Sequence, residues 1–181
     1  MTAAAMLAKL GKKVLVVEQH YVPGGYTHTF KRKKFLWDVG VHAVGEVTRH
    51  SLTGRLLEHL TDGRLEWTSL GPVYDEFYYP DGFRIDFPDH PKKFRDDLVS
   101  KFPEEERAID AYFVEIKKVA RSMRGYYLSK LLPRKFGSFV DSMFKTSHYF
   151  RVTTKQVLDQ LTDNQRLKTV LSAQWGYYGA L

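Results

Sequence analysis

The stretch that decides the fold runs from residue 2 to residue 18 and reads TAAAMLAKLGKKVLVVE. Thr2–Leu10 is rich in Ala, Leu and Met, which favour helix, and Gly11 follows as a typical C-terminal stop. Val14–Val17 is a short, mostly β-branched apolar run of the kind that forms a strand buried on both faces of a parallel sheet. Glu18 ends this run. The predicted order is therefore helix, tight turn, buried strand and acid.

This order is typical of the second half of a βαβ dinucleotide-binding unit. Such a unit needs a glycine-rich turn that approaches the pyrophosphate, a helix N-terminus that supplies amide donors, and an acid that binds the ribose about 20 residues beyond the glycines. The sequence supplies the helix, the strand and Glu18, but it contains no GxGxxG. Counted back from Glu18, that turn would end just before Met1, so we expect an N-terminal truncation. The alternative is an ordinary helix–strand pair that ends in a surface acid.

The following residues, up to position 87, predict short strands and one helix. A basic turn at Lys31–Lys34 separates the strand-like stretches Thr27–Phe30 and Phe35–Val39. His50–Leu60 places its leucines on one helical face. Glu76–Phe87 has the alternation and the Pro-Asp-Gly turn of a β-hairpin.

The remainder of the chain predicts helices. Pro91–Met123 is expected to be helical with a break at Pro103, because apolar side chains repeat at helical spacing after the break: Ile109, Tyr112, Phe113, Ile116, Ala120 and Met123. Residues 126–150 are aromatic and basic, with weak periodicity. The pairs Thr153/Gln156 and Thr162/Gln165 each have the spacing of a capping box, which predicts two short helices.

The composition describes a globular chain without cysteine. Of its 181 residues, 43% are hydrophobic and 27% are charged, which is too apolar for a disordered protein. The absence of cysteine excludes disulfides and thiolate sites. No apolar run approaches the roughly 18–20 residues that span a bilayer, and no secretory signal is visible. The net charge of +7 favours anionic partners.

Several stretches together resemble a known family. They are residues 2–11 (TAAAMLAKLG), 14–20 (VLVVEQH), 24–25 (GG), 27–30 (THTF), 35–42 (FLWDVGVH) and 171–179 (LSAQWGYYG). In these residues the chain is similar to the flavin-dependent family that includes retinol saturases, carotenoid isomerases and phytoene desaturases. Because members of that family are much longer, we also expect a truncation at the C-terminus.

The resemblance implies an α/β fold with two parts. Residues 1–63 would be a partial FAD-binding Rossmann-like (βαβ) domain, and residues 64–181 a partial substrate domain, inserted as a mixed α+β unit. The implied cofactor is FAD, with NAD or NADP as the candidate electron source. The implied activity is saturation of a double bond in a retinoid, all-trans-retinol first, at the endoplasmic reticulum membrane. Carotenoid isomerisation or desaturation, and a non-catalytic lipid-binding or membrane-surface role, are the alternatives.

The resemblance also assigns roles to single residues. Glu18 would bind the adenosine ribose, and Gly24 and Gly25 would pass close to the FAD backbone, where a Cβ would collide. Tyr26 stands where many relatives have an Arg, so no Arg–phosphate contact is expected at this position. His42 lies on a strand that in the family runs toward flavin and substrate; a hydrogen-bonded structural histidine is the alternative.

Other chemistry has little support in the sequence. Glu46 and His50 are four residues apart, but no HExxH or comparable ligand set occurs, so no metal site is expected. No serine is flanked by the glycines of a nucleophile elbow, which leaves hydrolase chemistry without support.

The basic and aromatic stretch at residues 126–155 indicates a membrane surface as a candidate partner. It holds six Lys or Arg residues and one acid, Asp141, interleaved with seven Phe or Tyr residues. Aromatic rings enter the headgroup region of a bilayer, and cations meet anionic lipid. The alternative is an exposed basic face over a packed aromatic core. Nucleic acid is not expected, because no recognised binding motif accompanies the charge.

Overall fold

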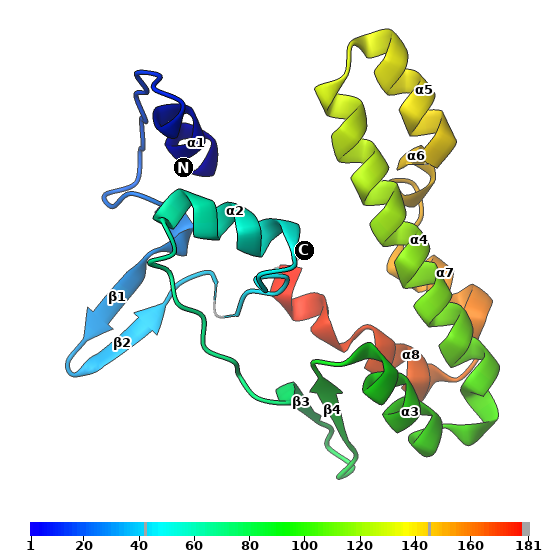
Figure 1. The fold of residues 1–181 in the computed structure, drawn as a ribbon. Coiled ribbons are helices and arrows are strands. Elements are labelled where there is room, and N and C mark those ends of the chain that lie inside the picture. Colours follow the sequence, from blue (N-terminus) through cyan, green and yellow to red (C-terminus); the bar gives the residue numbers. More distant parts are fainter. Residues whose placement is uncertain (42, 145, 179–181) are drawn as a thin grey trace. The chain divides into compact units, whose positions relative to one another are not determined.

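The computed structural model describes residues 1–41, 43–144 and 146–178 (Figure 1). The chain divides into two compact units, Met1–Ser69 and Leu70–Leu181. The predicted boundary at residues 63 and 64 lies shortly before this division. The assignment of residues 1–63 to FAD binding and of residues 64–181 to substrate binding stays a prediction.

The first unit combines two helices with one antiparallel hairpin. Its elements are α1 (Thr2–Lys9), the 3₁₀ turn η1 (Gly25–Thr27), β1 (Thr29–Arg32), β2 (Phe35–Asp38) and α2 (Leu52–Thr61). The hairpin β1–β2 places Thr29 opposite Asp38 and Arg32 opposite Phe35. The predicted strands, basic turn and helix of this region are therefore confirmed, with small shifts at their ends.

Helix α1 ends in a Schellman motif at the predicted glycine. Gly11 has a φ of 75°, its N–H donates to the Ala8 carbonyl at 2.9 Å, and the Lys12 N–H donates to the Leu7 carbonyl at 3.0 Å. This pattern satisfies carbonyls that the helix end leaves open. Lys9 forms an ion pair with Asp62, just beyond α2, and lowers the pKa of that carboxyl by hydrogen bonding and charge.

Val14–Val17 forms no strand in the structure, although the sequence predicts one that is buried on both faces. The four residues are between 39% and 86% exposed. A strand needs a neighbour that bonds to its backbone, and within the described part of the chain the only paired strands are β1 with β2 and β3 with β4. The expectation of burial is not met here, and the βαβ arrangement stays a prediction.

The second unit consists of one hairpin and a set of helices. Its elements are β3 (Val73–Tyr78), β4 (Arg84–Pro88), α3 (Pro91–Lys101), η2 (Pro103–Glu105), α4 (Glu106–Leu131), α5 (Arg134–Phe144), α6 (Thr146–Tyr149), α7 (Thr154–Leu161), α8 (Gln165–Leu171) and η3 (Ala173–Tyr178). The strands are antiparallel and irregular between Val73 and Asp75. The predicted hairpin and the break at Pro103 are confirmed.

The second unit has a hydrophobic core in which both strand and helix take part. The buried members are Ile85, Phe87, Leu98, Phe102, Ile109, Leu158, Leu167, Val170 and Leu171. At the edge of this core, Arg95 of α3 donates to both carboxylate oxygens of Asp110 on α4, at 2.7 and 3.0 Å. These bonds lower the pKa of Asp110. The first turns of α4 are therefore held by the burial of apolar side chains and by a bidentate ion pair.

Helix α4 continues well beyond the core and pairs with α5. The sequence predicts a helix to Met123 and weak periodicity afterwards, whereas α4 runs to Leu131. A Cβ on Gly137 would lie 2.6 Å from the Ser129 carbonyl oxygen, so the missing side chain lets α5 approach α4 closely. This contact could not be read from a 3.6-residue apolar repeat, because glycine and serine form it.

Of the two predicted capping boxes, the first is confirmed and the second is wrong. The Thr153 hydroxyl accepts from the Gln156 N–H, and the Gln156 side chain accepts from the Thr153 N–H. Helix α8 begins instead at Asn164, whose side chain accepts from the Leu167 N–H. Thr162 donates its hydroxyl to Glu105 at 2.7 Å, a contact between residues far apart in the sequence. No helix in the described residues is long and apolar enough to cross a membrane.

Candidate functional site

The structure places Glu18 beside Gly25 in the first unit. Glu18 is exposed, and its Oε1 accepts a hydrogen bond from the His20 N–H at 3.0 Å. A Cβ on Gly25 would lie 3.7 Å from Glu18 Oε2. The segment after Val17 therefore turns back at once, which brings the acid and the glycine together.

Gly24 lies near the start of α1. A Cβ on Gly24 would lie 3.1 Å from Thr27 Oγ1 and 3.9 Å from the terminal methyl carbon of Met1, which precedes the helix. Gly24 has a φ of 100° and Gly25 a φ of 55°, values that residues with a Cβ rarely adopt. Glu18, the glycine pair and the end of the Met1 side chain thus lie close together.

A network of rings and hydrogen bonds holds the loop that carries this glycine pair. His28 Nδ1 lies 2.7 Å from the Gly25 carbonyl, and His28 Nε2 lies 2.9 Å from the Tyr21 hydroxyl. Because a carbonyl can only accept, His28 Nδ1 is the donor in the first of these contacts. The His20 ring lies 4.3 Å from the Tyr21 ring and 4.7 Å from the His28 ring, centroid to centroid.

The end of β2 is packed against the same loop. A Cβ on Gly40 would lie 2.6 Å from the Tyr26 carbonyl oxygen, so only glycine fits at this position without a shift of the backbone. The Val39 N–H donates to the His28 carbonyl at 3.2 Å. The Tyr26 side chain is 81% exposed. His42, the predicted neighbour of flavin or substrate, lies outside the described residues.

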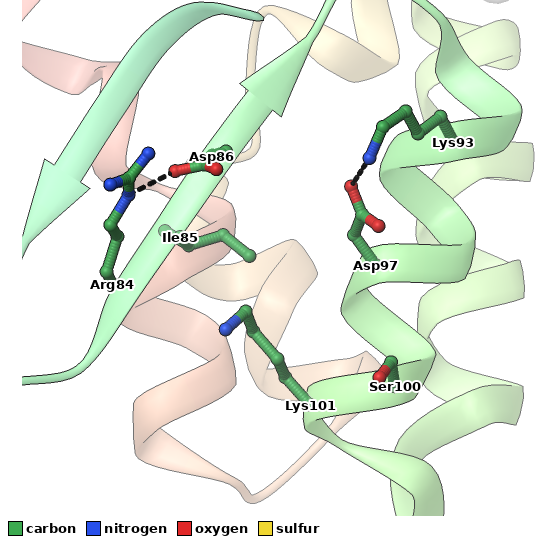
Figure 2. Close-up of a pocket in the computed structure, with 7 residues that line it drawn as sticks. All are labelled: Arg84, Ile85, Asp86, Lys93, Asp97, Ser100 and Lys101. Carbon is green, nitrogen blue, oxygen red and sulfur yellow. Dashed lines mark hydrogen bonds and ion pairs between the residues drawn. The ribbon is translucent and has the colours of Figure 1, made fainter.

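A charged cavity lies within the second unit, between β4 and α3 (Figure 2). Its volume is about 280 Å³, and its lining consists of Arg84, Ile85, Asp86, Lys93, Asp97, Ser100 and Lys101. Arg84 pairs with Asp86 and Lys93 pairs with Asp97, each at 2.6 Å. The Lys101 side chain extends toward β4. No sequence motif predicts this cavity. Its lining residues have the spacing that is found on any solvent-exposed face of a strand or a helix.

This cavity does not suit an apolar substrate. Six of the seven lining residues are charged or polar, and a long hydrocarbon would desolvate ion pairs there without replacing their partners. The described residues contain no group of three His, Cys, Asp or Glu that could hold a metal ion. The assignment of Glu18, Gly24 and Gly25 to cofactor binding stays a prediction.

Comparison with known proteins establishes the class to which the chain belongs. The family model for flavin-containing amine oxidoreductases matches residues 1–177. The chain belongs to this family, whose cofactor is FAD and whose FAD-binding part has a Rossmann-like α/β fold. No solved structure matches the chain significantly.

Among curated proteins, the chain is similar to retinol reductases and to prolycopene isomerases. It is 36% identical over 187 residues to the all-trans-retinol 13,14-reductase of Danio rerio, covering 98% of this chain and 31% of that protein. It is 32% identical over 181 residues to the inactive all-trans-retinol 13,14-reductase of the same fish, covering 95% and 30%. It is 31% identical over 134 residues to prolycopene isomerase 2, chloroplastic, of an Oncidium hybrid cultivar, covering 72% and 22%. The chain thus spans about a third or less of the length of these relatives.

Proposed function

We propose that the chain is part of an FAD-dependent oxidoreductase that saturates a double bond of a conjugated isoprenoid, with all-trans-retinol as the first candidate. The observation that carries the proposal is the proximity of Glu18, the Gly24–Gly25 pair and the end of the Met1 side chain in a chain of the flavin-containing family. The named reductase relatives support retinol as the substrate.

The residues at this site fit the adenosine ribose end of FAD. Glu18 is an exposed carboxylate that has one oxygen on the His20 N–H, and its other oxygen can accept from a ribose hydroxyl, as the acid of a dinucleotide-binding unit does. Gly24 and Gly25 present backbone without side chains at positive φ, which allows a close approach of the cofactor. The sequence holds no GxGxxG for the pyrophosphate, so the fit is limited to the ribose end.

The chemistry that this proposal needs is hydride transfer. A reduced flavin, when bound, supplies a hydride to one carbon of a double bond, and a proton completes the saturation at the other carbon. The reducing equivalents would come from NADH or NADPH. In this scheme the residues around Glu18 bind and orient the cofactor. We place the protein, as part of the same proposal, at the endoplasmic reticulum membrane.

Carotenoid isomerisation is the second candidate, and the prolycopene isomerase relatives favour it. Isomerisation leaves the mass of the substrate unchanged, whereas saturation adds hydrogen. The two activities can therefore be separated by mass spectrometry of the product.

A chimera tests the proposed activity. This chain would replace the matched region of the Danio rerio all-trans-retinol 13,14-reductase, which supplies the rest of the protein. Given all-trans-retinol and a reductant, we expect a dihydro product, because the chain contributes the Glu18 site to a complete flavin-binding unit. Given prolycopene, an isomer of unchanged mass would favour the second candidate. A folded, flavin-loaded chimera that converts neither substrate, beside an active parent enzyme, would contradict both.

A further inference from the structure

Helix α5 exposes a continuous apolar face. Phe136 is 67% exposed, Phe139 is 69% exposed and Met143 is 59% exposed. These positions are three and four residues apart, so the side chains lie on one side of the helix. Large exposed apolar patches are uncommon on soluble monomers and mark interaction sites.

Contacts on the other side of α5, away from this apolar face, hold the helix in position. Gly137 and Val140 are buried, and Gly137 packs so closely on α4 that an added Cβ would lie 2.6 Å from the Ser129 carbonyl oxygen. Helices α4 and α5 run side by side in Figure 1. The apolar face is therefore a fixed surface of the hairpin α4–α5.

The tip of this hairpin extends the apolar surface. Leu131 is 82% exposed and Leu132 is 37% exposed, and Tyr127, one turn earlier on α4, is 65% exposed. Along α4, Leu131 lies about 33 Å from the core residue Ile109, at about 1.5 Å per residue. The exposed surface therefore lies far from the core of its unit.

Charge distinguishes this hairpin from the strands and helices that come before it in its unit. Residues 116–144 hold seven Lys or Arg and one Asp, whereas residues 73–110 hold six Lys or Arg and eleven Asp or Glu. Lys130, Arg134 and Lys135, which flank the tip, are exposed. Some cations have local contacts, such as Lys118 with Glu115 and Arg121 over the Phe144 ring. The net charges of these two stretches are therefore +6 and −5.

We propose that the face formed by Phe136, Phe139 and Met143, together with the hairpin tip, docks on an anionic lipid surface. Helix α5 would lie in the plane of the interface with its apolar face among the acyl chains, and the cations would contact lipid phosphates, as in amphipathic interfacial helices. A second copy of the chain fits less well, because docking this face on itself would bring the exposed cations of two hairpin tips, Lys130, Arg134 and Lys135, together. The proposal concerns binding and does not rest on the proposed redox activity.

Vesicle co-sedimentation of the 181-residue chain tests the proposal. We expect strong binding to vesicles of phosphatidylcholine with phosphatidylserine, and binding at least about tenfold weaker to phosphatidylcholine alone, because several cations contribute. High salt should weaken the binding to the anionic vesicles. Equal binding to both vesicles, or none to either, would overturn the proposal.

Matched variants locate the surface. Phe136→Ser with Phe139→Ser should reduce anionic-vesicle binding at least about tenfold, since the helix loses its apolar anchors. Leu52→Ser with Leu70→Ser removes two other exposed apolar side chains, 84% and 61% exposed, and should leave binding unchanged. Circular dichroism checks that each variant is folded. If both double variants bind alike, the α5 face is not the docking surface.

A fluorescent label reports insertion without the loss of either phenylalanine. The chain has no cysteine, so Met143→Cys can carry a single polarity-sensitive dye, and exposed Lys92→Cys on α3 can carry the same dye as a control. Anionic vesicles should shift the emission of the dye at residue 143 to the blue and leave that at residue 92 unchanged. A blue-shifted dye at residue 143 without vesicles, with a dimer on gel filtration that the Phe136/Phe139 variant abolishes, would assign the face to a second copy and overturn the proposal.

Discussion

The 181-residue chain, purified by itself, is expected to elute from gel filtration without bound flavin and to reduce no retinol. The sequence contains no GxGxxG, and amides of such a turn, anchored by a preceding strand, hold the pyrophosphate in this class of site. Glu18 could bind a ribose, but the sequence supplies no GxGxxG turn for the adjoining phosphates. The visible absorbance spectrum of the protein peak measures the outcome.

The chimera with the Danio rerio reductase is the positive control for this result, because it also contains the part of that protein that lies outside the matched 31%. Free FAD is added to both proteins before gel filtration, so that both are exposed to the same concentration of the cofactor. A stoichiometric flavin spectrum in the 181-residue chain would show that other contacts bind FAD. In that case FAD binding would not depend on a glycine turn.

Replacement of Ile109 by Ala should destabilise the second unit by about 2–5 kcal/mol, the usual cost of a buried aliphatic truncation that leaves a cavity. Ile109 is fully buried where α4 meets β4, α3 and α8 in the core. Ile116 lies on the same helix but is 44% exposed, so Ile116→Ala should cost about 1 kcal/mol or less. Urea unfolding followed by circular dichroism measures both.

The comparison of these two variants is informative because the sequence pattern does not distinguish Ile109 from Ile116. Both belong to the same apolar repeat, and only the structure separates them. Equal losses of stability would mean that α4 is buried along its length, in contradiction to the exposed side chains of its second half. The apolar surface of α4–α5 would then be covered as well.

Local signals in the sequence predicted much of the secondary structure. Gly11 marks a helix end because its backbone can adopt a positive φ, and the turn at residues 80–82 joins two strands for the same kind of reason. The Thr153–Gln156 box fixes a helix start through bonds within four residues. Such features depend on neighbours in the chain, so the sequence alone contains the needed information.

Other features depend on distant partners and could not be predicted. Val14–Val17 has the composition of a buried strand, but strand formation requires a paired neighbour. Thr162 has the spacing of a cap, yet its hydroxyl bonds to Glu105, which is remote in sequence. The extension of α4 to Leu131 rests on its contact with α5, in which Gly137 takes part.

In the candidate site, too, some features could be predicted from the sequence and others could not. Glu18 could be singled out from its position after the apolar run, and Gly25 from the resemblance to the flavin-dependent family. Their proximity, and that of Gly24 to Met1, came from the fold of the loop. The charged cavity between β4 and α3 carries no sequence signal, because ion pairs such as Arg84–Asp86 follow ordinary surface alternation.

The most direct test of the proposed FAD site is the FAD affinity of the chimera with and without Glu18. Glu18→Ala should weaken FAD binding by about 1–3 kcal/mol, which is about 5- to 150-fold, because a charge-assisted hydrogen bond to the ribose is lost. Glu66→Ala, which removes another exposed acid of the first unit, should leave the affinity unchanged. An equal affinity of the Glu18→Ala chimera and the unaltered chimera, both folded, would contradict the assignment of this site to FAD.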